Sequence, residues 1–322
     1  EGYKMNEENS IVFGPVPSRR LGKSIGINNI PPKICTYSCI YCQLGRTHNM
    51  QISRQSFYDP NKIIEQTKEK IKHTKEKQEH IDYLTIVPDG EPTLDKNLGV
   101  LIKELKKLDY PVAVITNSSL ISREDVRNEL SLADWVSVKI DAITKETWKK
   151  VDRPHGKLNH EEILTGIQQF SKEFAGNLCT ETMLIDTVND ESEEFEKLSK
   201  FITSLKPKTS YLSIPTRPPA EQWVKPATEK KLTLAYQLFT DQHIPTEYLI
   251  GYEGNEFAFT GNAKQDILSI TAVHPMREDA VREFLKKADE TWDLINQLIQ
   301  EQKIVKHTLN KTAFYSRKLP KR

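Results

Sequence analysis

Short apolar runs alternate with longer amphipathic stretches through most of the first 254 residues. The runs have the length and composition of buried strands, and the stretches between them place apolar residues at the spacing of one helix face. Six strands are predicted: Ser24 to Asn28, Ile81 to Val87, Val112 to Thr116, Trp135 to Asp141, Leu178 to Ile185 and Tyr211 to Pro215. Helices are expected over Asp59 to His80, Asp95 to Leu108, Arg123 to Leu130, within Thr144 to Phe170, over Glu191 to Leu205 and over Ala227 to Gln242. This alternation predicts a parallel α/β architecture.

The fourth predicted strand alternates apolar and polar side chains. Its apolar positions are Val136, Val138 and Ile140, and its polar positions are Ser137, Lys139 and Asp141. A parallel strand covered by helices is usually apolar on both faces, and burying unpaired charges costs several kcal/mol each. Ser213 and Arg217 follow the same alternation at the sixth strand. The pattern therefore favours a barrel with a polar lumen, although a strand-end ion pair between Lys139 and Asp141 is an alternative.

A polar lumen at the strand ends and the length of the chain favour a partial (β/α)6 TIM-like barrel over a doubly wound sheet. We assign residues 1–254 to this barrel.

Beyond Gly254 the strand–helix rhythm stops. Residues 262–322 predict three short helices followed by a hairpin. The helices are Lys264 to Val273, Glu278 to Lys287 and Thr291 to Gln302, and the hairpin joins Ile304 to Leu309 and Thr312 to Lys318 through a turn at Asn310-Lys311. This order resembles a winged helix and is predicted as a second, C-terminal domain.

Composition narrows the function classes only slightly. The chain has 46 Lys and Arg against 45 Asp and Glu, so its overall charge does not indicate binding to nucleic acid or membrane. No apolar run approaches the roughly 20 residues that span a bilayer, and we expect a cytoplasmic protein. Residues 301–322, however, contain seven Lys and Arg and only one acidic residue, Glu301. The basic tail predicts phosphate contacts, a protein-docking or capping module, or a merely solvated end.

Three of the four cysteines lie within eight positions, at Cys35, Cys39 and Cys42. A loop with this spacing can supply three thiolates to an iron-sulfur cube and leave one iron open to a small molecule. Zinc bound with His48 as a fourth ligand is an alternative, although structural zinc sites usually contain two CxxC-type pairs. Cys179 begins an apolar run, where a buried and inert thiol is expected.

The CxxxCxxC spacing with the aromatic Tyr41 before the last cysteine resembles the radical S-adenosylmethionine (SAM) superfamily. The resemblance implies a 4Fe-4S cluster on the three cysteines, with SAM chelated to the open iron. Asp89-Gly90-Glu91-Pro92 follows the second strand and is similar to the superfamily's Gly-Glu motif. A glycine permits close approach of backbone, and a carboxylate can receive the SAM amino group, although the segment could also be a simple turn.

The same resemblance implies further contacts. Candidate SAM contacts are Tyr41, Gly90, Glu91, Pro92, Thr116, Asn117, Ser118, Lys139, Asp141, Met183 and Ser213. Candidate substrate contacts are Arg19, Arg20, Arg153 and Arg217. Surface arginines are often only solvated, and Met183 could be core filler. An external electron donor of the flavodoxin or ferredoxin type is an implied partner.

The run GPVPSRRLGKSIGINNIPPK is similar to the start of radical SAM proteins related to wybutosine-synthesis (4-demethylwyosine synthase) enzymes. Those enzymes use a second cluster, held largely by cysteines upstream of the loop, and this sequence has no cysteine before Cys35. Three functions therefore stay open. They are a radical enzyme acting on RNA or a small metabolite, an activase or maturase acting on a protein, and a non-catalytic iron-sulfur sensor that binds DNA.

Overall fold

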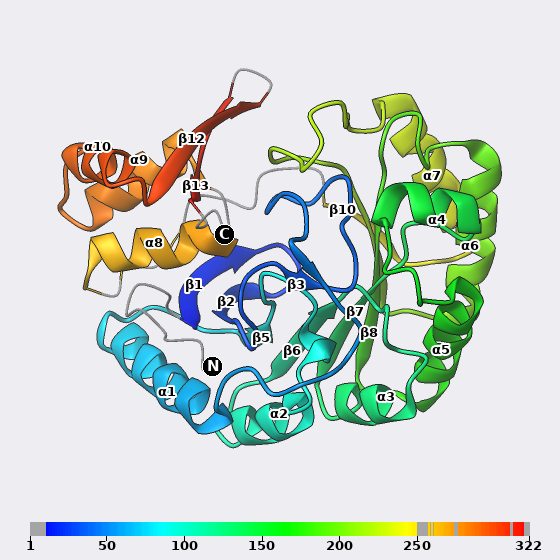
Figure 1. The fold of residues 1–322 in the computed structure, drawn as a ribbon, viewed down its shortest axis with the longest axis horizontal. Helices are drawn as coiled ribbons and strands as arrows, with labels where there is room; N and C mark the ends of the chain where they lie inside the picture. Colours follow the sequence, from blue (N-terminus) through cyan, green and yellow to red (C-terminus); the bar gives the residue numbers. More distant parts are fainter. Residues whose placement is uncertain are drawn as a thin grey trace.

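An eight-stranded sheet forms the centre of the molecule (Figure 1). The computed structural model describes residues 11–249, 257, 259, 261–273, 276–309 and 312–318. The strands lie in the order β1 (Val12–Ser18), β2 (Gly22–Ile27), β5 (Tyr83–Ile86), β6 (Val112–Thr116), β7 (Trp135–Lys139), β8 (Asn177–Met183), β9 (Thr209–Ser213) and β10 (Thr246–Leu249). β1 is antiparallel to β2, and the remaining neighbours are parallel. β1 and β10 are the two edges of this order, so the sheet is an open, curled partial barrel.

All six predicted strands are present, and the sheet contains two more than the six-strand barrel predicted from the sequence. β1 was missed because Gly14, Pro15 and Pro17 are typical of a loop. In the structure Gly14 has φ 99° and the β1–β2 register shifts between Phe13 and Val16, so the glycine lies in a bulge. β10 was missed because the polar residues Thr246 and Glu247 leave no apolar run in its four residues.

Seven helices follow the strands around the outside of the curved sheet (Figure 1). They are α1 (Pro60–Glu76), α2 (Leu98–Lys106), α3 (Glu124–Leu130), α4 (Lys145–Asp152), α5 (His160–Glu173), α6 (Ser192–Leu205) and α7 (Glu229–Asp241). In α1, the Asp59 side chain caps the N-terminus by accepting a hydrogen bond from Asn61, and Pro60 occupies the first turn. Ile63 and Ile71 face the core from this helix. Each such side chain contributes roughly 1.5–3 kcal/mol by burial.

Alternate side chains along each strand pack on opposite faces of the sheet. Val114, Val136 and Leu212 belong to the large core under the helices. Ala113, Trp135, Cys179 and Tyr211 form a separate cluster with Leu21 on the inner face. Cys179 is therefore buried, as the sequence predicted, and the inner cluster closes one end of the barrel.

The C-terminal segment, residues 261–318, contains the three predicted helices and the hairpin. The elements are α8 (Ala263–Val273), β11 (Met276–Arg277), α9 (Glu278–Lys287), α10 (Asp293–Gln300), β12 (Ile304–Leu309) and β13 (Thr312–Arg317). The three strands pair in the order β11-β13-β12. Predicted features at Gly254, the Asn310-Lys311 turn and the basic residues Lys321 and Arg322 lie outside the described residues.

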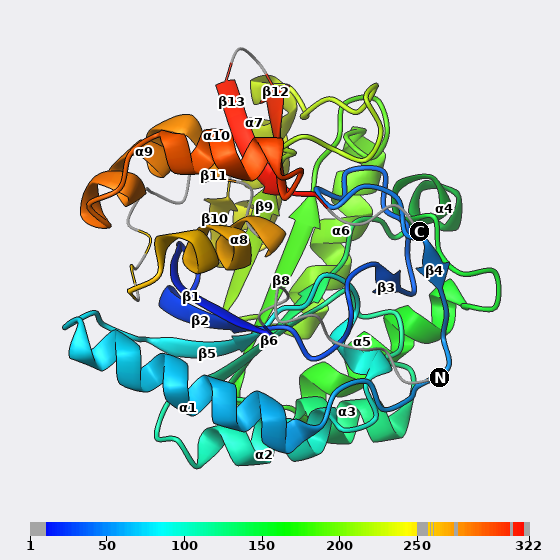
Figure 2. The same cartoon turned by 60° about the vertical axis from the view of Figure 1, so that its left-hand side comes forward.

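This segment packs against the first strands of the barrel (Figure 2). α8 lies on β1, and Val16 packs against the small core that contains Ile267 and Phe284. Lys70 of α1 pairs with Asp266 of α8 at 3.4 Å, and Lys287 of α9 pairs with Glu79. Among the described elements, no helix has the length and apolar character needed to cross a membrane.

Candidate active site

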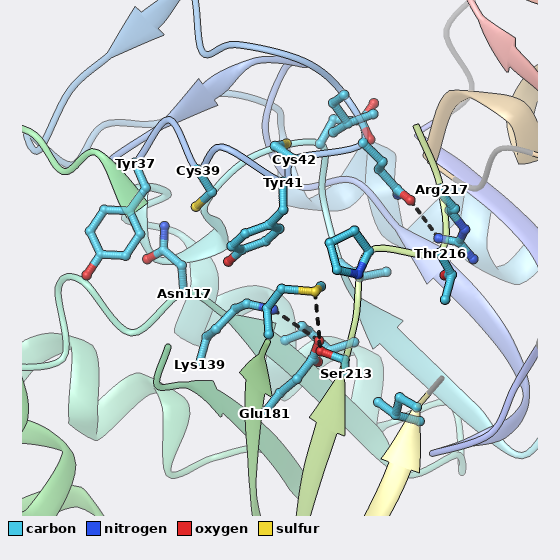
Figure 3. A pocket seen from close by; sticks show the side chains of 18 of the residues that line it. Tyr37, Cys39, Tyr41, Cys42, Asn117, Lys139, Glu181, Ser213, Thr216 and Arg217 are labelled. Carbon is cyan, nitrogen blue, oxygen red and sulfur yellow. Dashed lines mark hydrogen bonds and ion pairs between the residues drawn. The ribbon is translucent and has the colours of Figure 1, made fainter. Parts of the chain in front are cut away.

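A cavity of about 630 Å³ opens where the parallel strands end, the edge at which barrel enzymes place their sites (Figure 3). Its wall includes the cysteine loop, the ends of β6 to β9 and the loop after β9. The C-terminal segment adds Arg277 and Phe314. The strand parity seen in the sequence is confirmed, because Ser137, Lys139 and Ser213 line this cavity.

Cys35, Cys39 and Cys42 all line the cavity. Their loop leaves β3 (Ile34–Cys35), which pairs with β4 (Asn49–Met50). The free thiols are only half-buried, so they are accessible from the cavity. Burial raises the pKa of Cys35 to about 12, with the Glu91 carboxylate adding to the effect. Burial likewise raises the pKa of Cys39 and Cys42.

The donor set fits an iron-sulfur cluster better than a zinc ion. Iron would bind these thiols as thiolates and displace their protons, which offsets the raised pKa. No group of three His, Cys, Asp or Glu side chains in the described ranges is arranged to hold a single metal ion. A cubane does not require such convergence, because each thiolate binds a different iron. His48, the fourth ligand of the zinc alternative, is exposed and does not line the cavity.

Gly90 allows the end of β5 to touch the start of the cysteine loop. A Cβ at this position would lie 1.9 Å from the backbone oxygen of Ile34. The backbone N–H of Glu91 donates to that same oxygen at 3.2 Å. The glycine predicted from the motif is therefore required by backbone packing beside Cys35.

Glu91 is fully buried and does not line the cavity. Its carboxylate accepts hydrogen bonds from the Thr93 N–H (3.1 Å) and hydroxyl (2.5 Å), the Thr116 hydroxyl (2.6 Å) and the Asn117 N–H (2.7 Å). Burial raises the pKa of Glu91, and these hydrogen bonds act against that rise. Glu91 thus holds Thr116 and Asn117, which do line the cavity, in place from behind.

Lys139 forms an ion pair with Glu181, not with Asp141 as the alternative interpretation proposed. The two residues are register partners on β7 and β8, and Lys139 Nζ lies 3.0 Å from Glu181 Oε1. Arg20 pairs with the same carboxylate, and Ser213 Oγ donates to it at 3.3 Å. Burial alone would raise the pKa of Glu181, but Lys139 and Arg20 lower it to about 2.

Asp141 instead fixes the aromatic residue of the cysteine loop. Its carboxylate accepts from the Tyr41 hydroxyl at 2.5 Å and from the Met183 N–H at 2.7 Å. Lys139 Nζ lies 5.0 Å from the centroid of the Tyr41 ring, within cation–π range. Tyr41, Lys139 and Met183 line the cavity, whereas Asp141 lies behind them.

The remaining predicted residues divide into those in the cavity wall and those behind it. Arg19, Arg20 and Arg217 line the cavity. Pro92 and Ser118 are buried outside it, and the Ser118 hydroxyl accepts from the Lys139 N–H at 3.0 Å. The Arg153 side chain pairs with Glu221 and does not line the cavity.

Sequence reasoning missed six charged or aromatic lining residues: Lys33, Tyr37, Asp89, Glu181, Arg277 and Phe314. Glu181 had a detectable signal, because it shares the parity of Met183 on a strand beside Lys139. Lys33 lines the same cavity as the three cysteine thiols. Burial lowers the pKa of Lys33, and Cys42, Asp89 and Cys35 act to raise it. Arg277 and Phe314 carried no signal, because only the folded C-terminal segment brings them to the cavity.

The chain is similar to known proteins in sequence and in fold. A model of the radical SAM superfamily matches residues 29–202. A UPF0026 protein of Methanocaldococcus jannaschii is 44% identical over 97% of this chain and 98% of its own length. A radical SAM methyltransferase from Sphaerobacter thermophilus has a similar fold, with a TM-score of 0.52 at 14% identity over 70% of this chain and 66% of that one. The structure of TYW1 with a lysine-pyruvate adduct covers 93% of this chain and 82% of its own, at 15% identity and a TM-score of 0.45.

Proposed function

Because this chain belongs to the radical SAM superfamily and, within it, to the UPF0026 proteins, we propose a specific reaction type for it. The enzyme binds a 4Fe-4S cluster through Cys35, Cys39 and Cys42, cleaves SAM reductively and removes a hydrogen atom from an RNA or small-molecule substrate. One observation carries this proposal: three thiols line a polar cavity at the strand ends. A sensor would not need such a cavity.

The cofactors supply the chemistry when bound. A cluster held by Cys35, Cys39 and Cys42 would pass one electron from an external flavodoxin- or ferredoxin-type donor to SAM. Cleavage of the sulfonium C5′ bond would then give methionine and a 5′-deoxyadenosyl radical able to take a hydrogen atom from the substrate. The protein must bind the reactants in a fixed orientation and exclude other hydrogen donors.

We assign the SAM contacts to the residues that line the cavity beside the cysteine loop: Tyr41, Gly90, Thr116, Asn117, Lys139, Met183 and Ser213. Tyr41 offers an aromatic face for the adenine, and Lys139 offers a cation for a carboxylate or a donor for a hydroxyl. Glu91, Pro92, Ser118 and Asp141 act from behind as positioning residues. Glu91 holds Thr116 and Asn117, and Asp141 holds Tyr41 and Met183.

We propose that residues 262–322 form a winged-helix-like domain that caps the barrel of residues 1–254. The order α8, β11, α9, α10, β12, β13 supports this assignment, as does a hydrophobic core separate from that of the barrel. Arg277 and Phe314 in the cavity wall favour a role in the active site over DNA binding at a distance.

The test is anaerobic reconstitution with iron and sulfide, followed by dithionite and SAM. We expect about four irons per chain and release of 5′-deoxyadenosine. Failure to bind iron or failure to release 5′-deoxyadenosine would overturn the proposal. Mass spectrometry of RNA, metabolites and proteins from a deletion strain would then separate an RNA or metabolite substrate from a protein substrate.

A further inference from the structure

Basic side chains outnumber acidic ones on the cavity wall. Among the described lining residues six are basic, and only Asp89 and Glu181 are acidic. The basic residues are Arg19, Arg20, Lys33, Lys139, Arg217 and Arg277. A partly enclosed cavity with a surplus of one charge attracts ligands of the opposite charge. The imbalance therefore indicates an anionic ligand.

Some of this positive charge lies beside the cofactor residues. Lys33 lies against the cysteine loop, and its Nζ donates to the Arg46 carbonyl at 3.3 Å. Lys139 stands over the Tyr41 ring and shares Glu181 with Arg20. These three basic residues lie beside the cysteine loop and Glu181.

The other three arginines come from separate elements. Arg19 lies in the turn between β1 and β2, Arg217 in the loop after β9, and Arg277 in β11. The Arg217 guanidinium donates to the Gln43 side chain at 2.6 Å. Figure 3 shows Arg217 across the site from Tyr37 and Cys39, with Tyr41 between them. Arg19, Arg217 and Arg277 thus line one cavity from three segments that are far apart in the sequence.

SAM does not require this group of arginines, because it carries a single carboxylate together with an ammonium and a sulfonium group. A guanidinium presents several N–H donors in a plane, which match the oxygens of a phosphate group. We propose that Arg19, Arg217 and Arg277 form a subsite that binds a phosphate-bearing substrate. This inference rests on the proposed function for the reaction, but phosphate binding itself needs neither cluster nor SAM.

Arg277 makes the C-terminal segment part of this subsite. Its backbone pairs with Phe314 in the β11–β13 register, and its Nε lies 3.2 Å from Asp279 Oδ1. Packing of α8 on β1 and the Lys70–Asp266 ion pair hold the segment against the barrel. The substrate site is therefore completed by residues that follow the barrel in sequence.

The experiment is calorimetric titration of the full chain, purified without cluster, with inorganic pyrophosphate. We expect Arg217→Gln and Arg277→Gln each to weaken binding on the order of tenfold or more, because each removes a charge-assisted contact. Arg277→Lys, which retains the charge without the planar fork, should fall between wild type and Arg277→Gln. Arg282→Gln is the matched control, since Arg282 pairs with Glu278 on the outer side of α9 and does not line the cavity.

A nucleoside triphosphate and a short single-stranded RNA, titrated in the same way, separate the two sources of phosphate. Tighter binding of either one than of pyrophosphate, lost in both Gln variants, would support the inference and identify the source. Undetectable pyrophosphate binding at millimolar concentration would overturn it, as would unchanged affinity in both Gln variants or equally tight binding of citrate. Pyrophosphate binding is measured without cluster or SAM, so it supports a phosphate site even if SAM cleavage is not detected. Failure of this inference and failure of the proposed function are therefore distinguishable.

Discussion

Lys139 and Glu181 face each other across neighbouring parallel strands, with Nζ and Oε1 3.0 Å apart, and the Glu181 carboxylate also pairs with Arg20. The Arg20–Glu181 ion pair joins β8, in the middle of the sheet, to the turn between β1 and β2. One carboxylate thus fixes the positions of two cations that line the cavity.

We predict that Glu181→Gln destabilises the protein by about 3 kcal/mol at neutral pH, because it leaves two largely buried cations without their shared carboxylate. Urea unfolding measures the change. Glu193→Gln is the control, since the Glu193 side chain is 81% exposed in its pair with Lys197 and its loss should change stability far less than the loss of Glu181.

The same variant has a defined pH dependence. The pKa of Glu181 falls from its ordinary value of 4.5 to about 2 in the folded protein. A depressed folded-state pKa contributes stability that is complete above the ordinary pKa and is lost as pH falls through the folded value. The stability gap between wild type and Glu181→Gln should therefore narrow between about pH 4.5 and 2. A gap that stays constant over that range would show that ionisation of Glu181 is not its source.

Glu91→Gln distinguishes a positioning role from direct binding of SAM. The amide NH2 would replace one of the two carboxylate oxygens. In its less disruptive orientation it opposes the Asn117 N–H, which now bonds to Oε2, while the amide oxygen still accepts from Thr93 and Thr116. We predict a loss of about 1–3 kcal/mol in unfolding free energy without any ligand, because the buried Asn117 N–H loses its acceptor. Unchanged stability combined with weaker SAM binding would assign Glu91 to SAM directly.

Gly90→Ala tests the contact between β5 and the cysteine loop. The added methyl group would overlap the Ile34 backbone oxygen, so the start of the loop must move. We predict reduced iron content after reconstitution, measured against protein by a colorimetric iron assay. Gly156→Ala is the control, because an added Cβ there meets nothing within 4 Å. Equal iron content in both variants would argue against a tight steric requirement at Gly90.

The sequence was sufficient to predict the strands and the inner face where local pattern determines them. Val136 and Val138 alternate with Ser137 and Lys139 because one face packs under helices and the other faces a polar cavity. The cysteine spacing is equally local. β1 was not predictable, because Gly14 and the prolines beside it become a strand only through pairing with β2.

Ion-pair partners could not be predicted either. Asp141 lies two positions from Lys139 and is the nearest acid in sequence. The β7–β8 register instead places Glu181 opposite Lys139, and these two residues form the ion pair. Arg277 in β11 is more than a hundred residues from the cavity residues of β7, and packing of α8 on β1 brings its segment to the barrel. Such long-range relationships depend on packing that no local pattern reports.

The most direct test of the account is 5′-deoxyadenosine formation by reconstituted wild type, Cys39→Ala and Cys179→Ala under dithionite and SAM. Cys39 lines the cavity, whereas Cys179 is buried in the inner cluster. We predict about four irons and 5′-deoxyadenosine for wild type and Cys179→Ala, and the loss of both in Cys39→Ala. Cluster assembly and SAM cleavage that persist in Cys39→Ala would contradict it.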